Sequence, residues 1–175
     1  MIKTQSVQPF ELRAYTTQLV DILQNCVDGG ASVGFIQPFP RAENEAFWQE
    51  SVFPQVDSGA RRLFVATEGK QILGTVQLIL GMPANQPHRG EVAKLLVHQS
   101  ARRKGVAIAL MAALEQCALE EHRRLLTLDT RTGDVSQSLY QKLGFQIAGM
   151  IPGYCLSTDS KSMDSTTYMY KTLLN

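Results

Sequence analysis

Three consecutive cations, Arg102, Arg103 and Lys104, stand directly before Gly105 in the stretch VHQSARRKGVAIALMAALEQCA. A helical pattern of apolar residues begins at that glycine. Positive charge at the start of a helix is unfavourable, because it repels the positive end of the helix dipole. The arrangement is explained if an anion from outside the chain binds there. The alternative is a solvated basic turn.

The start of this predicted helix offers the other groups that an anion site needs. Its first backbone N–H groups have no partner within the helix, and such an end binds a pyrophosphate well. Gly105 and the small Ala107 allow phosphates to approach the backbone closely, and Arg102 and Lys104 add positive charge. Neither a P-loop nor a Gly-x-Gly-x-x-Gly turn is present. The residues therefore predict a pyrophosphate site of another kind.

Three further side chains could move protons. Tyr140 lies in a short predicted helix, and a phenol is protonated at neutral pH and can donate that proton. Glu91 opens a predicted strand, and Asp129 ends another, where a carboxylate commonly faces a ligand crevice. Three structural alternatives remain open. Tyr140 could pack in the core, Glu91 could pair with an arginine, and Asp129 could cap the next helix.

The elements that position these residues follow from hydrophobic periodicity. Apolar residues at helical spacing predict helices over residues 9–27, 40–56, 105–118 and 134–145. Strands are expected at residues 61–67, 71–80, 91–97, 125–130, 145–151 and 166–174, and the first two form a hairpin. Segments 81–90 and 152–165 read as loops. This order predicts an α/β (α+β) fold, a mixed sheet with helices on both faces.

The composition narrows the class of protein. The 175 residues are 44% hydrophobic and 19% charged, typical of one globular domain, expected to span residues 1–175. The net charge of +1 disfavours a nucleic-acid partner. No signal peptide or membrane-spanning run is expected. Three widely separated cysteines predict a reducing, cytoplasmic location without disulfides. The three histidines lack metal-ligand spacing, so no metal is expected.

Two motifs carry a family resemblance. Arg102-x-x-Gly105-x-Ala107 after a strand, followed by Leu139-Tyr140-x-x-Leu143-Gly144-Phe145, resembles the GNAT acetyltransferase superfamily. The resemblance implies a mostly antiparallel sheet whose central parallel strand pair is splayed at the cofactor site, and acetyl-CoA as the cosubstrate. It places the tyrosine beside the thioester sulfur. The cofactor-binding residues it implies are Leu95, Leu96, Val97, Arg102, Arg103, Lys104, Gly105, Val106, Ala107, Ser136 and Tyr140.

Acetyl transfer to an amine assigns roles to these groups. The amine must be neutral, and an amine of pKa near 10.4 costs about 4.6 kcal/mol to deprotonate at pH 7. Glu91 resembles the glutamate base of the histone-acetylating branch, and Asp129 is the alternative base or ammonium ligand. Tyr140 is expected to protonate the leaving thiolate. A backbone N–H within residues 94–97, with Leu96 preferred, is expected to polarise the carbonyl oxygen.

A narrower resemblance concerns the acceptor. Segments 29–35, 90–97, 128–130, 152–155 and 170–173 look like the acetyltransferases that confer resistance to tabtoxin by acetylating an amino-acid-like β-lactam toxin. An asparagine often found in the superfamily seven residues before the tyrosine is replaced here by Gly133. Acceptor selection in the family comes from the segments that correspond to 29–39 and 152–165.

The expected substrate-binding residues are Phe35, Glu91, Asp129 and Tyr154. Phe39 and Trp48 could also wall the pocket, although aromatic residues at this spacing are more often core. Asp159 could add a charge there, with a solvated loop residue as the alternative.

These patterns predict an acetyl-CoA-dependent N-acetyltransferase acting on a primary amine of a small molecule, such as an antibiotic or an amino-acid-like toxin. The alternatives are acetylation of a protein N-terminus or lysine, and an idle acetyl-CoA-binding module. Neither nucleic acid nor membrane is expected as a partner, and the family resemblance suggests a homodimer.

Overall fold

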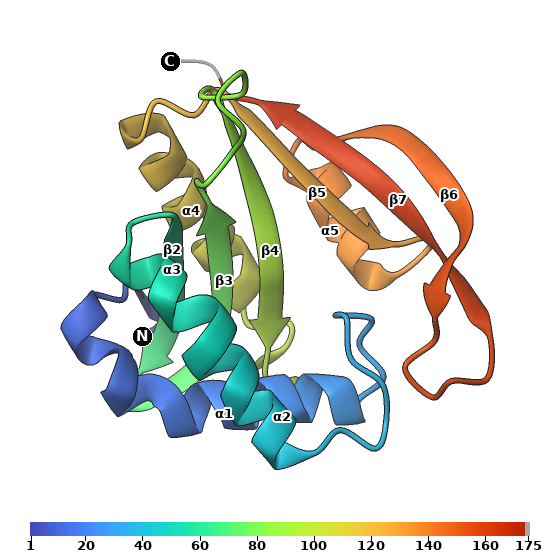
Figure 1. The fold of residues 1–175 in the computed structure, drawn as a ribbon, viewed down its shortest axis with the longest axis horizontal. Coiled ribbons are helices and arrows are strands. Elements are labelled where there is room, and N and C mark those ends of the chain that lie inside the picture. The colour runs from blue at the N-terminus through green and yellow to red at the C-terminus, as the bar shows by residue number, and fades with distance from the viewer. Residues whose placement is uncertain (174–175) are drawn as a thin grey trace.

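A single mixed sheet forms the centre of the computed structural model, which describes residues 1–173 (Figure 1). Its seven strands run in the order β1-β2-β3-β4-β5-β7-β6. All neighbouring strands are antiparallel except β4 and β5, which are parallel. The strands are β1 Lys3–Ser6, β2 Arg61–Glu68, β3 Gln71–Ile79, β4 Arg89–Val97, β5 Leu125–Arg131, β6 Gln146–Leu156 and β7 Met163–Thr172.

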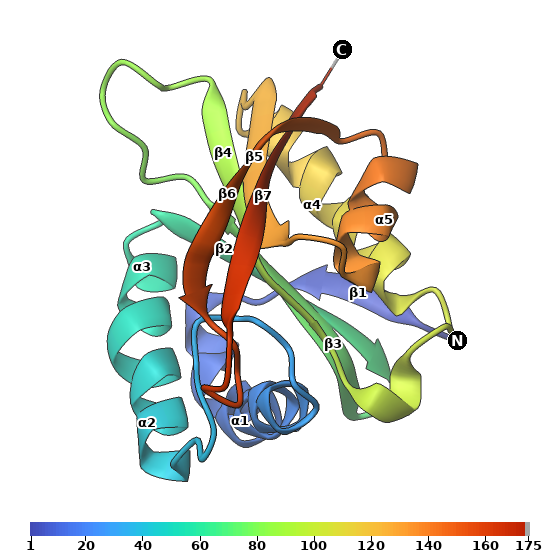
Figure 2. The same cartoon turned by 90° about the vertical axis from the view of Figure 1, so that its right-hand side faces the viewer.

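The helices lie on both faces of this sheet, as predicted (Figure 2). One face carries α1 to α3 and the other carries α4 and α5. The helices are α1 Leu12–Asp28, α2 Arg41–Ala46, α3 Phe53–Asp57, α4 Val106–Glu120 and α5 Val135–Lys142, with 3-10 turns η1 Pro9–Glu11 and η3 Gln99–Ala101 and a π-helical turn η2 Phe47–Val52. Within residues 1–173, no helix is long and apolar enough to cross a membrane.

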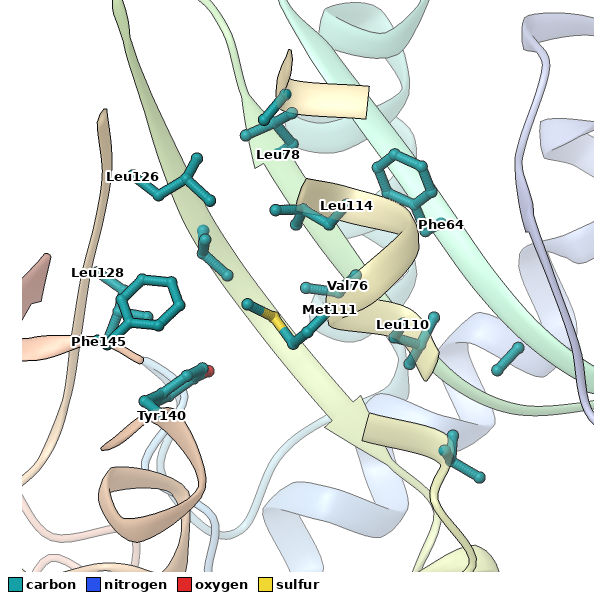
Figure 3. Packing of buried hydrophobic residues seen from close by; sticks show 14 of the residues in the cluster. Phe64, Val76, Leu78, Leu110, Met111, Leu114, Leu126, Leu128, Tyr140 and Phe145 are labelled. Atoms are coloured by element: carbon teal, nitrogen blue, oxygen red, sulfur yellow. The ribbon is translucent and has the colours of Figure 1, made fainter. Parts of the chain in front are cut away.

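Two hydrophobic clusters hold the layers together. Strand β2 shows the alternation that separates them: Leu63 and Val65 pack toward α1 to α3, whereas Phe64 and Ala66 pack toward α4. The α4 cluster includes Leu110 and residues of β5, and it reaches Tyr140 and Phe145 at its edge (Figure 3). The site residues are therefore attached to a packed scaffold.

Three features differ from the sequence-based expectation. Strand β1 was not predicted. The helix expected over residues 40–56 is interrupted by the π-helical turn η2, which ends two residues before Pro54. Proline lacks the N–H that a regular helical hydrogen bond requires. Residues 152–156, expected as a loop, continue β6, and only 157–162 connect it to β7. Leu174, at the end of the last expected strand, lies outside the described residues.

The parallel pair β4 and β5 separates along its length. The two strands pair only at Arg89–Leu125, Gly90–Leu126 and Glu91–Thr127. Beyond that point the register of β4 against β3 shifts, and Lys94 has a left-handed backbone with φ of 51°. Such a bulge bends and twists a strand. The carboxyl ends of β4 and β5 consequently diverge, which confirms the predicted splay.

Candidate active site

A cleft of about 930 Å³ occupies the space where β4 and β5 diverge. Its walls come from five parts of the chain: the end of α1 with the loop after it, β4, the start of α4, the end of β5 with α5, and β6–β7. The predicted cofactor-binding residues that line it are Leu95, Leu96, Val97, Arg102, Arg103, Gly105, Val106, Ala107, Ser136 and Tyr140. Lys104 does not line this cleft. The basic turn therefore faces the cleft with two of its three cations.

The turn before α4 has the backbone geometry that an anion site needs. Gly105 is left-handed, with φ of 81°, and a Cβ atom placed on it would contact nothing within 4 Å. The space beside the first N–H groups of α4 is therefore open. Arg103 is also left-handed, with φ of 61°. The residues present fit the pyrophosphate of an acetyl-CoA molecule.

Tyr140 is both a core residue and a cleft residue. It is buried, and its ring packs edge-on against Phe145 with centroids 5.6 Å apart (Figure 3). It also lines the cleft. Burial raises the pKa of the phenol well above its usual value, and the charge of Asp129 adds to this effect. The hydroxyl is therefore a protonated donor at neutral pH.

The two candidate carboxylates line the same cleft from neighbouring strands. Glu91 forms an ion pair of 3.4 Å with Arg89, and 41% of its side chain is exposed. Asp129 accepts a hydrogen bond of 3.1 Å from the Thr166 hydroxyl. The helix cap expected as its alternative role is made by Asp134 instead. Glu91 thus makes the anticipated arginine contact, yet both carboxylates remain within the site.

The sequence profile of the acetyltransferase (GNAT) family matches residues 25–145. This segment covers more than half of the chain and includes both the basic turn and Tyr140. The chain belongs to the GNAT acetyltransferase family.

Solved structures agree on the fold. An N-acetyltransferase from Staphylococcus aureus is 20% identical, with a TM-score of 0.79 and 98% of each chain covered. A ribosomal-protein-alanine N-acetyltransferase from Brucella melitensis is 21% identical, with a TM-score of 0.77, and covers 98% of this chain and 99% of its own. A Salmonella typhimurium protein solved with its cofactor acetyl-CoA is 15% identical, with a TM-score of 0.78, and covers 100% and 95%.

Other predicted residues of this GNAT domain are divided between core and cleft. Phe39 and Trp48 are buried core residues. Phe35 does not line the cleft but packs against Phe39 and Phe47, with centroids 4.4 and 5.2 Å away. Tyr154 lines the cleft. Aromatic spacing alone could not separate these positions.

Tyr154 is paired with a second tyrosine. Its hydroxyl lies 2.9 Å from the hydroxyl of Tyr168, and this hydrogen bond, with smaller effects of burial and nearby charge, raises the pKa of Tyr168 to about 12. Tyr168 stands opposite Asp129 in the β5–β7 register. Tyr154 therefore lines the cleft itself, whereas Tyr168 supports it from the position opposite Asp129.

Asp159 lies outside this cleft, in the turn between β6 and β7. Its carboxylate accepts hydrogen bonds from the Ser157 hydroxyl and the Lys161 backbone N–H. These contacts lower its pKa. Asp159 thus shapes the turn, which agrees with its reading as a loop residue.

Sequence reasoning missed three cations that line the cleft, Lys94, Arg131 and Lys142. Arg131 makes ion pairs with Asp134 and Asp164, at 3.5 and 3.6 Å, and donates to the Gly30 carbonyl at 3.3 Å. The available signal for Lys94 was a charged residue inside the apolar run EVAKLLV. Among residues 1–173, no group of three or more His, Cys, Asp or Glu side chains is arranged for a metal ion.

The loop between α1 and α2 lines one side of the cleft with residues 29–34. The Gln37 N–H donates to the Thr158 carbonyl at 2.7 Å, and the Thr158 hydroxyl donates to the Ala31 carbonyl at 3.0 Å. Figures 1 and 2 show this loop beside the tip of the β6–β7 hairpin. The two segments predicted to select the acceptor are therefore joined to each other by hydrogen bonds.

Proposed function

We propose that this GNAT acetyltransferase transfers the acetyl group of acetyl-CoA to a primary amine of a small molecule. The observation that carries the proposal is the link between the α1–α2 loop and the β6–β7 turn beside the cleft, made by the hydrogen bonds from the Gln37 N–H to the Thr158 carbonyl and from the Thr158 hydroxyl to the Ala31 carbonyl. A long peptide would need an open groove at this end. A small amine fits a site that is walled on this side.

Acetyl-CoA supplies the activated acetyl group when bound, and the residues of the chain do the rest. The backbone N–H groups at the start of α4, with Arg102 and Arg103, bind the pyrophosphate. A backbone N–H near Leu96 donates to the carbonyl oxygen of the acetyl group, which stabilises the negative charge that develops there. These contacts would hold the thioester in the cleft that Tyr140 also lines.

Two proton transfers are needed, one from the amine of the acceptor and one to the leaving thiolate, and different residues of the cleft carry them out. Asp129 and Glu91 bind the ammonium form of the acceptor and take up its proton, directly or through water. Tyr140 holds the proton that the departing thiolate requires. Because its pKa is raised by burial, this proton stays on the phenol until it is needed.

Resistance to an antibiotic or to an amino-acid-like toxin is the biological role that we propose for this activity. It rests on the resemblance of segments 29–35 and 152–155 to enzymes of that kind, and on the enclosed acceptor site. The alternative acceptors are a protein N-terminus or a lysine side chain.

The test is thiol release from acetyl-CoA with purified protein and a panel of amino acids, aminoglycosides, polyamines and short peptides. Turnover with one or more small amines, and little with peptides, is expected. Turnover with peptides alone would contradict the small-molecule proposal. Tight acetyl-CoA binding without turnover of any acceptor would indicate an idle binding module.

A further inference from the structure

Lys94 occupies an unusual position for a lysine. It lies at the bulge of β4, with its side chain along the cleft. Its Nζ atom is 5.8 Å from the ring centroid of Phe35 and 5.8 Å from that of Phe47. A Cβ atom placed on Gly34 would lie 3.5 Å from the same nitrogen. The ammonium group is therefore held between two rings and the α1–α2 loop.

No described residue makes a hydrogen bond or ion pair with this ammonium group within the usual limits. A lysine normally extends its charged end into water, and removal of an unpaired charge from water is costly. The two aromatic rings offset part of that cost. Burial is the main cause of the lowered pKa of Lys94, and Asp129 partly counteracts it. The side chain is thus a partly buried cation whose donors have no partner among the described residues.

The other charged groups around Lys94 define what could bind it. Asp129 and Glu91 line the same cleft, and both raise the pKa of Lys94, whereas Arg61 lowers it. The acceptor region thus presents one unpaired ammonium group and two carboxylates on adjoining strands. A ligand with a positive and a negative group a few bonds apart matches this arrangement.

We propose that Lys94 binds a carboxylate of the acceptor, so that the substrate is an amine that also carries a carboxylate, as amino acids do. The amine of such a substrate faces Asp129 and Glu91, and its carboxylate accepts hydrogen bonds from Lys94. The inference rests on the proposed function, because it assigns the acceptor side of the same cleft. Polyamines and aminoglycosides, which lack a carboxylate, are disfavoured by the same lysine.

The experiment compares matched acceptors with the intact enzyme. Each of several L-amino acids is assayed beside its carboxamide and its decarboxylated amine, with thiol release as the readout. The carboxamide has the same side chain and stereochemistry but no negative charge. We expect kcat/KM to be at least about tenfold higher for the amino acids that are turned over than for their carboxamides, equal to about 1.4 kcal/mol.

Two variants at position 94 isolate the charge. Lys94→Met keeps a straight side chain of similar length at the left-handed position, and Lys94→Arg keeps the cation. We expect the ratio of kcat/KM between amino acid and carboxamide to fall about tenfold in Lys94→Met and to recover in Lys94→Arg. Lys70→Met, at an exposed turn, is the matched control. Calorimetric binding of acetyl-CoA to each variant verifies that the cleft is intact.

The outcomes separate this inference from the proposed function. Turnover of carboxamides and amino acids with equal efficiency, or an unchanged ratio in Lys94→Met, would overturn the role of Lys94 and leave a small-amine acetyltransferase. Failure of every small amine to react would contradict the proposed function. In that case calorimetry with the same amino acids decides the inference: binding that requires Lys94 supports it, and absence of binding overturns it.

Discussion

Asn25 and Gln99 are held to each other by two hydrogen bonds, both donated by Gln99. The Gln99 backbone N–H donates to the Asn25 side-chain oxygen at 2.9 Å, and the Gln99 amide donates to the Asn25 backbone carbonyl at 3.0 Å. Asn25 lies in the last turn of α1, and Gln99 begins the 3-10 turn η3 that leads to Arg102. This pair therefore fixes the basic turn relative to α1.

Loss of this pair should affect both stability and cofactor binding. Asn25→Leu removes the side-chain acceptor of the exposed Gln99 N–H, so we expect the free energy of unfolding to fall by about 1 kcal/mol. Because η3 is released, the Kd for acetyl-CoA should rise several-fold. Asn25→Asp keeps the acceptor oxygen and is the control. Urea unfolding and calorimetry measure the two effects, and equal behaviour of the two variants would contradict this role.

The cations of the basic turn should contribute unequally. Arg102 lines the cleft and Lys104 does not. We therefore expect Arg102→Ala to raise the Kd for acetyl-CoA about tenfold, or about 1.4 kcal/mol, because a charged hydrogen bond to a phosphate is lost. Lys104→Ala should change it by about twofold at most, which makes it a matched control. An unchanged Kd for acetyl-CoA in the variant that combines Arg102→Ala with Lys104→Ala would contradict the pyrophosphate site.

Removal of the Tyr140 hydroxyl should slow the chemical step. Tyr140→Phe preserves the ring that packs against Phe145 but cannot donate a proton. A positioned general acid typically contributes about 100-fold or more, so kcat should fall by about that factor. The affinity for acetyl-CoA should change little. A variant that keeps its full kcat would show that Tyr140 serves packing alone.

The same tyrosine predicts the alkaline behaviour of the enzyme. Because the pKa of Tyr140 is raised, its proton is retained as the pH passes the ordinary phenol value of about 10. We expect kcat at saturating substrate to show no loss from this group between pH 8 and about 10. An alkaline decline centred below 10 that disappears in Tyr140→Phe would contradict the raised pKa.

The helices, most strands and the layered mixed sheet were predictable, whereas several strand boundaries and the contacts between distant side chains were not. Residues 12–28 and 106–118 form helices because apolar side chains recur at helical spacing, and the Arg102–Ala107 turn is read from adjacent residues. Strand β1 was not predicted because its four residues form an edge strand with little burial, which leaves no clear apolar pattern in the sequence. The continuation of β6 through Pro152 was not predicted because proline usually ends a strand. Here β6 is an edge strand with a register irregularity at this point, and such a strand accommodates a proline.

The acceptor side depended on contacts distant in sequence. Phe35 and Trp48 both fit an aromatic pocket wall from spacing alone, and only the tertiary packing shows that Trp48 is fully buried and that Phe35 packs against Phe39 and Phe47. The ammonium group of Lys94 is held by the rings of Phe35 and Phe47, which lie 59 and 47 positions away in the chain. Such proximity is a property of the tertiary fold and has no local pattern.

The short pairing of β4 with β5 also bears on cooperativity of unfolding. Three residue pairs join the strands on either side of the cleft, while antiparallel ladders run through β1–β4 and through β5–β7. We expect backbone amides of β5–β7 to exchange with solvent through an opening that leaves β2–β4 protected. A ligand that contacts both sides of the cleft binds only when β2–β4 and β5–β7 are both folded. Such a ligand should therefore suppress the separate opening of β5–β7, so that the amides of both parts exchange in one step. We therefore expect the boundary between β4 and β5, where the cleft lies, to be where the fold opens first.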